Sequence, residues 1–173
     1  KEAMSYNFAL VTEERKINGI FSKADLVFNT TITNLERYLK CRVLQAKKME
    51  AATKKEMERL KTKANSIFDP ITSLSGGNQQ KIILGKWIDR NPDIFLMDEP
   101  TRGIDVGAKY EIYELMVDMA KAGKTIIVVT SEMPEILGIT NRIAVMSNHR
   151  LSGIVNTKTT TQETLLRLSA KYL

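Results

Sequence analysis

The sequence has almost none of the residues that form disulfides and histidine-based metal centres. Among its 173 residues there is one cysteine, Cys41, and one histidine, His149. A single cysteine excludes an internal disulfide and a metal cage built from cysteines alone, so we expect Cys41 to be a reduced thiol in a cytosolic protein. A single histidine excludes a metal site with several histidine ligands. The chemistry of the chain must therefore rest on other side chains.

Long hydrophobic runs are missing as well. The longest aliphatic run in a strand-like segment has four residues, 126–129, whereas a helix needs roughly 20 apolar residues to span a bilayer. No signal peptide is recognisable at the N-terminus. The first residue is Lys1 rather than Met, which indicates a piece of a longer protein. Since 43% of the residues are apolar, we expect a globular chain of about one domain.

The net charge of +6 is concentrated in one stretch. Residues 31–66 contain ten basic and four acidic side chains, whereas residues 1–30 (four of each) and 67–173 (twelve of each) are neutral overall. Tyr38 is the only aromatic residue of the stretch, which argues against base stacking. Two interpretations stay open. The stretch is either a solvated helical face or a basic surface that faces anionic lipid headgroups or nucleic acid.

Short apolar runs indicate strands. They occupy residues 8–12, 94–97 and 125–130. Continuous runs of this kind are typical of strands buried in a parallel sheet. Two further runs, 142–146 and 151–155, flank a four-residue polar turn and predict a terminal hairpin, with His149 as a solvated turn residue.

Segments of helical character lie between these runs. Residues 33–63 contain no Gly or Pro and predict two helices. Apolar spacing predicts further helices at 75–90, 108–121 and 162–172, and a short one from Glu132. Strands that alternate with helices indicate an α/β fold with a largely parallel sheet, to which the basic helical segment adds a subdomain.

Two carboxylates, Asp98 and Glu99, directly follow the 94–97 strand. Ligands of open α/β sheets bind at the carboxyl edge of the strands. Asp98 can hold Mg²⁺ through water, and Glu99 can orient or deprotonate an attacking water. Taken alone, the pair is also what an ordinary strand-end turn contains.

The segment LSGGNQQK, at residues 74–81, opens the 75–90 helix. Ser75 can cap the helix, and Gly76 and Gly77 leave backbone N–H groups uncovered at the positive end of the helix dipole. This arrangement predicts a phosphate site with a hydroxyl donor. The alternative is a serine cap followed by two glycines that allow close packing.

The motifs LSGGNQQK, DIFLMDEPT and RGIDVGAK together resemble the signature motif, Walker B strand and D-loop of the ABC-type ATPases. Two more segments, VTEERKINGIF and SEMPEILGITNRIAVMS, resemble the second nucleotide-binding half of bacterial sugar importers. The resemblance covers nearly the whole chain. It implies part of a RecA-like P-loop NTPase core and an α-helical subdomain. The implied parts are a core strand with the Q-loop region (1–30), the helical subdomain with the signature helix (31–90) and the remaining core (91–173).

In that family two cassettes meet head to tail, and each Mg²⁺-bound ATP lies between the P-loop and Walker B of one cassette and the signature helix of the other. The resemblance therefore implies that Asp98 binds the metal and that Glu99 is catalytic. It implies that the signature residues contact the ATP of the other cassette. These residues are Leu74, Ser75, Gly76, Gly77, Asn78 and Gln79.

Three further positions carry implied roles. Glu13 stands where the family usually has the Q-loop glutamine, and Ser131 stands where it usually has the switch histidine. Ser131 is also a candidate N-cap for the helix that follows, which has Pro134 in its first turn. Asp105 corresponds to the D-loop aspartate, but it is equally a candidate N-cap for the 108–121 helix. We expect Trp87 to pack in the core rather than stack on adenine.

A complete P-loop is missing from the sequence. The motif is G-x-x-x-x-G-K-[ST] between a strand and a helix. The only Gly-Lys-Thr, at residues 123–125, has Asp118 five positions earlier and a predicted strand after it. By the resemblance, the phosphate-binding loop would precede Lys1, so we expect these 173 residues alone to be inactive toward ATP.

The resemblance implies the ATP-hydrolysing subunit of a sugar importer, on the cytoplasmic face of the bacterial plasma membrane. Its partners would be the first cassette of the same polypeptide, transmembrane permease subunits and, indirectly, a sugar-binding protein. The basic stretch motivates one alternative, a nucleic-acid- or ribosome-associated ABC ATPase. Because that stretch lacks long heptad repeats, we expect no nucleic acid partner. A non-catalytic interaction module is the third interpretation.

Overall fold

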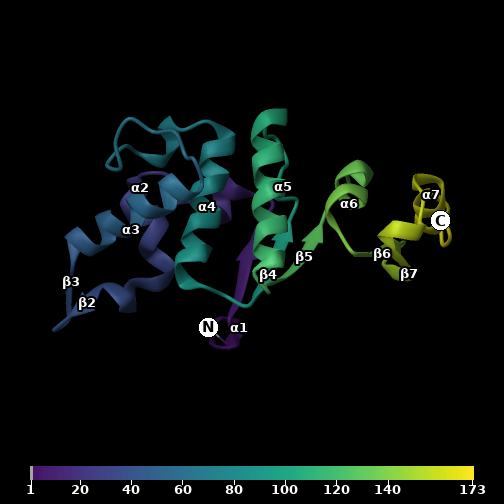
Figure 1. Cartoon of the computed structure of the whole chain (residues 1–173), viewed down its shortest axis with the longest axis horizontal. Helices are drawn as coiled ribbons and strands as arrows, with labels where there is room; N and C mark the ends of the chain where they lie inside the picture. Colours follow the sequence, from purple (N-terminus) through teal and green to yellow (C-terminus); the bar gives the residue numbers. More distant parts are fainter. Residues whose placement is uncertain (1) are drawn as a thin grey trace. The chain divides into compact units, whose positions relative to one another are not determined.

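The computed structural model describes residues 2–173 and separates them into two compact units, the first ending at Val129 and the second comprising Thr130–Leu173 (Figure 1). Within residues 2–173, no helix is long and apolar enough to cross a membrane. The elements of the first unit are α1 (Glu2–Ser5), β1 (Phe8–Val11), η1 (Arg15–Gly19), α2 (Leu26–Thr31), η2 (Ile32–Tyr38), β2 (Leu39–Lys40), β3 (Val43–Leu44), α3 (Ala46–Arg59), η3 (Ile71–Ser73), α4 (Gly76–Arg90), β4 (Ile94–Asp98), α5 (Val106–Lys121) and β5 (Thr125–Val129).

The three predicted strands form one parallel sheet in the order β1-β4-β5, which confirms the α/β fold. The expectation that these strands are buried on both faces of the sheet, however, is wrong for this unit. Phe95 and Met97 of β4 are buried, whereas Leu10 and Ile127, which flank Leu96 in register, are each 51% exposed. Alternate side chains of a strand point to opposite faces of a sheet. Only one face of this sheet is therefore fully covered within the first unit.

Helices α2, α3 and α4 pack against one another beside the sheet. Two helices were predicted between residues 33 and 63. The structure has two helical segments there, the 3₁₀ helix η2 and the α-helix α3, and between them a short hairpin, β2–β3, that was not predicted. Its two-residue turn places Cys41 and Arg42 at φ +50° and +64°, which matches the twist of a hairpin. At the end of η2, the Tyr38 hydroxyl donates to the Asp89 carboxylate at 2.6 Å.

The second unit contains α6 (Met133–Ile139), β6 (Arg142–Ser147), β7 (Arg150–Asn156), η4 (Thr157–Thr159) and α7 (Gln162–Ser169). The terminal hairpin is confirmed, with a turn of two residues instead of four. Asn148 and His149 form it at positive φ, and His149 is exposed as predicted. Ile143, Val145 and Leu165 make the core of this unit.

The division of the chain into three parts, with boundaries between residues 30 and 31 and between residues 90 and 91, stays a prediction. The first of these boundaries falls inside α2, one residue before its end. The second coincides with the end of α4, where Asn91 adopts the left-handed conformation of a helix C-cap.

Lys86 is a buried cation that connects α4 to η1. Lys86 is only 7% exposed, and its Nζ donates to the Gly19 carbonyl at 2.7 Å. Burial lowers the pKa of Lys86 from 10.5 to about 8. Between these two values the unfolded chain keeps a proton that the folded chain has released. The free energy of unfolding should therefore rise with pH across this window.

We expect Lys86→Met, which keeps the length of the apolar stem, to remove this pH dependence. Urea unfolding of the protein and the variant at several pH values between 7 and 10 would measure it. The difference in unfolding free energy between the two proteins should shift in favour of the parent above pH 8. Parallel curves over the whole range would contradict the prediction.

Candidate functional site

The turn after β4 holds two carboxylates at the carboxyl edge of the sheet. Asp98 ends the strand and Glu99 follows it, both half-buried. Glu99 has φ +42°, a conformation that is costly for a residue other than glycine and recurs at functional sites. Its N–H donates to the Val129 carbonyl at 2.8 Å, at the end of β5. The backbone of Glu99 is thereby fixed against the neighbouring strand.

The residues at this edge fit a magnesium ion that is shared with phosphate. No cluster of three or more His, Cys, Asp or Glu suited to a metal ion occurs among residues 2–173, so the described chain has no protein cage for a metal. Mg²⁺ in nucleotide sites takes only one or two carboxylates and completes its shell with water and phosphate oxygens. Asp98, with Glu99 next to it, satisfies that smaller requirement.

The start of α4 is organised around Ser75. As predicted, Ser75 is the N-cap, and its Oγ accepts hydrogen bonds from the Asn78 N–H at 3.4 Å and from Asn78 Nδ2 at 3.0 Å. Asn78 Oδ1 in turn accepts from the N–H of Lys63. Ser75 is exposed, and a hydroxyl that accepts two bonds still has its own proton to donate. An exposed donor therefore stands at the positive end of a 15-residue helix.

Leu74 and Gln79 support this helix start from below. Both are buried, and Gln79 Nε2 donates to the Leu74 carbonyl at 2.9 Å. The contact holds the loop before Ser75 against the second turn of α4. A contact of Leu74 and Gln79 with nucleotide stays a prediction.

Close packing explains the second glycine of the signature segment. A Cβ at Gly77 would lie 2.4 Å from the Cβ of Ala108, in the first turn of α5, and a Cβ at Gly76 would lie 2.9 Å from an Arg15 guanidinium nitrogen. A distance of 2.4 Å between two carbons is far inside van der Waals contact. Of the two interpretations of these glycines, close packing therefore holds for Gly77 whether or not phosphate binds nearby.

Charged side chains connect the segment after β1 with the loop after β4. The Arg15 guanidinium donates to the carbonyls of Arg102 and Gly103, at 2.8 and 3.3 Å. Arg102 forms an ion pair with Glu13. The negative charge at the Q-loop position is therefore compensated by a cation from the loop after β4. Both arginines lie inside segments that carry the family resemblance, VTEERKINGIF and RGIDVGAK, but the sequence analysis assigned neither of them a role.

Asp105 and Lys81 fix the beginning of α5. Asp105 Oδ1 accepts from the Ala108 N–H at 3.0 Å, so the N-cap interpretation of Asp105 is confirmed. Lys81 Nζ lies 2.5 Å from Glu111 Oε2, which ties α4 to α5. A role of Asp105 at a nucleotide stays a prediction.

Ser131 does not cap α6. The N-cap position is occupied by Glu132, without a side-chain capping bond, and the Glu132 N–H donates to Thr130 Oγ1 at 3.1 Å. Thr130 closes a local turn just before the helix, because its hydroxyl accepts from the N–H two residues later, and the helix has no side-chain cap. Pro134 lies in the first turn of the helix, as predicted. The switch role of Ser131 stays a prediction, and Ser131 belongs to the second unit.

Two further expectations about this region are settled. Gly123 lies in a turn at φ +88° and β5 begins at Thr125, so the Gly-Lys-Thr at 123–125 is no phosphate loop. Trp87 is half-buried in α4, with Lys86 Nζ 5.8 Å from the centre of its ring. The first finding agrees with the sequence analysis, whereas Trp87 keeps part of its surface exposed and is not the fully packed core residue that was expected.

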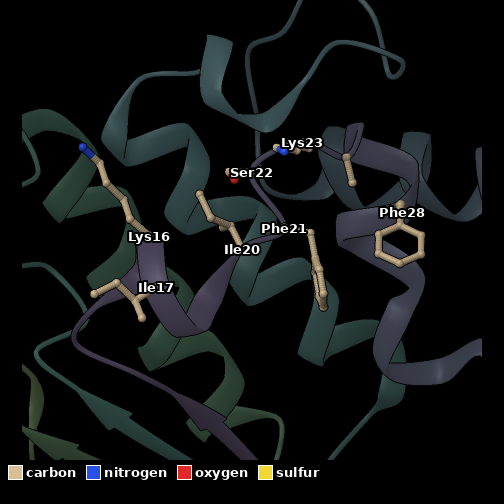
Figure 2. Close-up of a pocket in the computed structure, with 8 residues that line it drawn as sticks. Lys16, Ile17, Ile20, Phe21, Ser22, Lys23 and Phe28 are labelled. Carbon is tan, nitrogen blue, oxygen red and sulfur yellow. The ribbon is translucent and has the colours of Figure 1, made fainter.

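An open hollow of about 510 Å³ lies beside η1 and the start of α2. Figure 2 shows Lys16, Ile17 and Ile20 on one side of it and Phe21 and Phe28 on the other. The two phenyl rings meet edge to face at 5.2 Å, and Ile17 is 72% exposed. None of the lining residues is acidic. The hollow therefore suits an apolar or acidic partner segment better than a metal-bound nucleotide.

Comparison with known sequences identifies close relatives. The sequence pattern described as ABC transporter matches residues 5–102. The galactose/methyl galactoside import ATP-binding protein MglA of Treponema denticola is 68% identical over 173 residues, which are 100% of this chain and 35% of that protein. The protein of the same name from Escherichia coli (strain K12) is 51% identical over 99% of this chain and 34% of its own length. The chain thus spans about a third of the length of the curated relatives that it matches.

Solved structures support the fold. A dimeric ATP-binding cassette in a post-hydrolysis state, bound to ADP and Pi, superposes with a TM-score of 0.73 at 18% identity, over 91% of this chain and 67% of that one. An ATP-binding cassette of an ABC transporter reaches a TM-score of 0.75 at 18% identity, over 96% of this chain and 70% of that one. At such low identity these likenesses concern the fold alone.

Proposed function

The chain belongs to the ABC transporter family, and from this premise we propose that it forms the later part of the second nucleotide-binding domain of a galactose or methyl galactoside importer. The observation that carries the proposal is the joint presence, in one unit, of the Ser75-capped helix and the Asp98–Glu99 pair. The name of its 68% identical relative supports the choice of substrate. Binding of ATP is a property of the family.

The proposed chemistry divides the site residues between two composite ATP sites. Asp98 would hold Mg²⁺ on the phosphates of the nucleotide bound by the same domain, and the metal would neutralise developing charge there. Glu99 would accept a proton from the attacking water. Phosphoryl transfer depends mostly on positioning and charge stabilisation. The strained and hydrogen-bonded backbone of Glu99 supports such a positioned base.

The signature side would act on the ATP of the other cassette. The Ser75 hydroxyl and the first N–H groups of α4 would donate to its γ-phosphate, and Asn78, bonded to Ser75, would orient that hydroxyl. Leu74 and Gln79 would hold the loop in place rather than touch the nucleotide. Glu13 and Asp105 would face the nucleotide interface from loops that Arg102 and α5 support.

The hollow beside η1 is the proposed contact surface for a permease subunit. Three apolar residues around it, Ile17, Phe21 and Phe28, are exposed to a degree unusual for their size. Exposed apolar groups of this kind mark protein interfaces. The residues that line the hollow come shortly after the Q-loop position Glu13 in the sequence. A permease segment bound there would therefore respond to a nucleotide-dependent movement of that loop. This would place the protein on the cytoplasmic face of the membrane.

Transport-coupled ATP hydrolysis tests the proposed function. We expect the protein, assembled with its permease subunits and sugar-binding protein in vesicles, to hydrolyse ATP faster when galactose or methyl galactoside is added. A polypeptide of these 173 residues alone is the control and should neither bind Mg-ATP tightly nor release phosphate, because it has no complete P-loop motif. Phosphate release and calorimetric titration measure both. Stimulation by unrelated sugars only, or turnover by the control, would contradict the proposal.

A further inference from the structure

The positive charge of the chain is displayed on the surface of the first unit. All ten basic residues between 31 and 66 are exposed, whereas Glu56, one of the four acidic residues there, is buried. Burial raises the pKa of the Glu56 carboxyl. Arg37 and Arg59 form ion pairs with Asp89 and Glu56. These two ion pairs offset part of the positive charge, and the other basic residues of the stretch are exposed on the surface.

The hairpin β2–β3 combines this charge with exposed aliphatic groups. Leu39, Val43 and Leu44 are 46%, 63% and 44% exposed. Leu39 pairs with Leu44 and Lys40 pairs with Val43, so the two leucines share one face of the hairpin and Val43 lies beside Lys40 on the other. Figure 1 shows the hairpin at the margin of α2, α3 and α4. Aliphatic groups surrounded by cations are typical of elements that bind at a lipid headgroup layer.

The same contacts argue against nucleic acid. Tyr38, the only aromatic residue between 31 and 66, is 3% exposed, and its hydroxyl is bonded to Asp89. Burial and the neighbouring Asp89 carboxylate raise the pKa of Tyr38 above its usual range, so it stays neutral. Surfaces that bind single strands use exposed aromatic side chains as stacking platforms. Exposed leucine and valine have no comparable use along a phosphate backbone.

We propose that the β2–β3 hairpin and the first turn of α3 form a docking surface for anionic lipid headgroups. The hairpin enters the headgroup layer turn first, so that Leu39 and Leu44 on one face and Val43 on the other both contact it. Four cations face the lipid phosphates and carboxylates. These cations are Lys40, Arg42, Lys47 and Lys48, all exposed. The inference goes beyond the proposed transport function, because the contact is made with lipid directly and needs no permease.

Vesicle binding tests the proposal. The protein, purified without any membrane subunit, is sedimented with vesicles of phosphatidylcholine alone or mixed with phosphatidylserine. We expect binding to the mixed vesicles only, and weaker binding at high salt. Lys40→Glu/Arg42→Glu should lower the partition coefficient by at least about tenfold. Val43→Ser/Leu44→Ser should lower it as well, without a change in charge. Circular dichroism confirms that the variants are folded.

A matched control separates a local surface from net charge. Lys121→Glu/Lys158→Glu changes the total charge by the same amount at exposed positions outside residues 31–66, and it should bind like the parent. The proposal is overturned if this control loses as much vesicle binding as the hairpin variants do. It is also overturned if the hairpin variants bind vesicles as well as the parent. Preference for duplex DNA or for RNA over the vesicles, with a steep salt dependence, would overturn it in favour of a nucleic acid surface. Vesicle binding involves no ATP hydrolysis, so its failure and that of the transport function are distinguishable.

Discussion

Replacing Gly77 with alanine should destabilise the first unit strongly. The new Cβ would lie 2.4 Å from the Cβ of Ala108, so α4 and α5 must move apart or deform. Extra methyl groups in well-packed interiors typically cost about 1–3 kcal/mol and occasionally more. The gain in helix propensity from Gly to Ala offsets only ~1 kcal/mol of this. Because two helix backbones form the contact, we expect a net loss of about 2 kcal/mol, measured by urea unfolding.

Two further variants test whether the contact between Gly77 and Ala108 causes the loss of stability. Ala108→Gly in the Gly77→Ala background removes the other side of the contact and should restore much of the lost stability. Gly138→Ala is the matched control, since a Cβ at Gly138 in α6 meets no atom within 4 Å, and it should be neutral or mildly stabilising. A Gly77→Ala protein as stable as the parent would show that the α4–α5 contact is not as close as described.

The regular elements of the core were predictable from local pattern. Apolar runs located β1, β4 and β5, and the spacing of Ile112, Met116 and Met119 located α5, because these patterns report directly on burial at periods of two and 3.6 residues. Caps were predictable where one side chain serves its own helix, as with Ser75 and Asp105. The family was predictable from the order and spacing of three motifs, and the comparisons confirm it.

What depends on distant residues was not predictable. The β2–β3 hairpin interrupts a stretch of helical composition, and Tyr38, next to it, is bonded to Asp89, 51 positions later. The incomplete cover of the sheet at Leu10 and Ile127 depends on which helices reach that face, and apolar character alone does not reveal it. Ser131 is not the cap because α6 begins one residue later than expected, with Glu132 at the N-cap position. The first two misses reflect tertiary contacts that outweigh a local preference.

The pairing of Glu13 with Arg102 changes how the candidate ATP sites are compared. From the sequence, Glu13 would add a negative charge beside the phosphates. In the structure, Arg102 offsets that charge. The main difference from the usual family site is therefore Ser131, which stands in place of the switch histidine. A serine hydroxyl is shorter than an imidazole and cannot bring positive charge to the γ-phosphate. Loss of one preorganised donor typically costs about 10²–10³ in rate. The composite site that contains Glu99 should therefore be the slower of the two.

The signature side is best tested at Ser75 rather than at the glycines. An aspartate at Gly77 would disturb the contact with Ala108 before it met any nucleotide, so it cannot separate folding from catalysis. Ser75→Asp keeps a good N-cap for α4, but it removes the exposed hydroxyl donor and places a negative charge at the helix start. Ser75→Asn is the matched variant, because it keeps a cap without the charge.

We expect Ser75→Asp to lower steady-state ATP hydrolysis of the assembled transporter by about 10²-fold, a loss typical of one missing donor even before charge repulsion is added. Ser75→Asn should lose less, because it adds no repulsion. Glu99→Gln should leave a substantial fraction of the activity, since under the proposed function it removes a base from the composite site whose switch position holds a serine. Phosphate release, measured for all three variants with permease and sugar present, decides the matter. Equal collapse of Ser75→Asp and Glu99→Gln would show that both composite sites turn over ATP, and that a serine in place of the switch histidine does not slow the site containing Glu99.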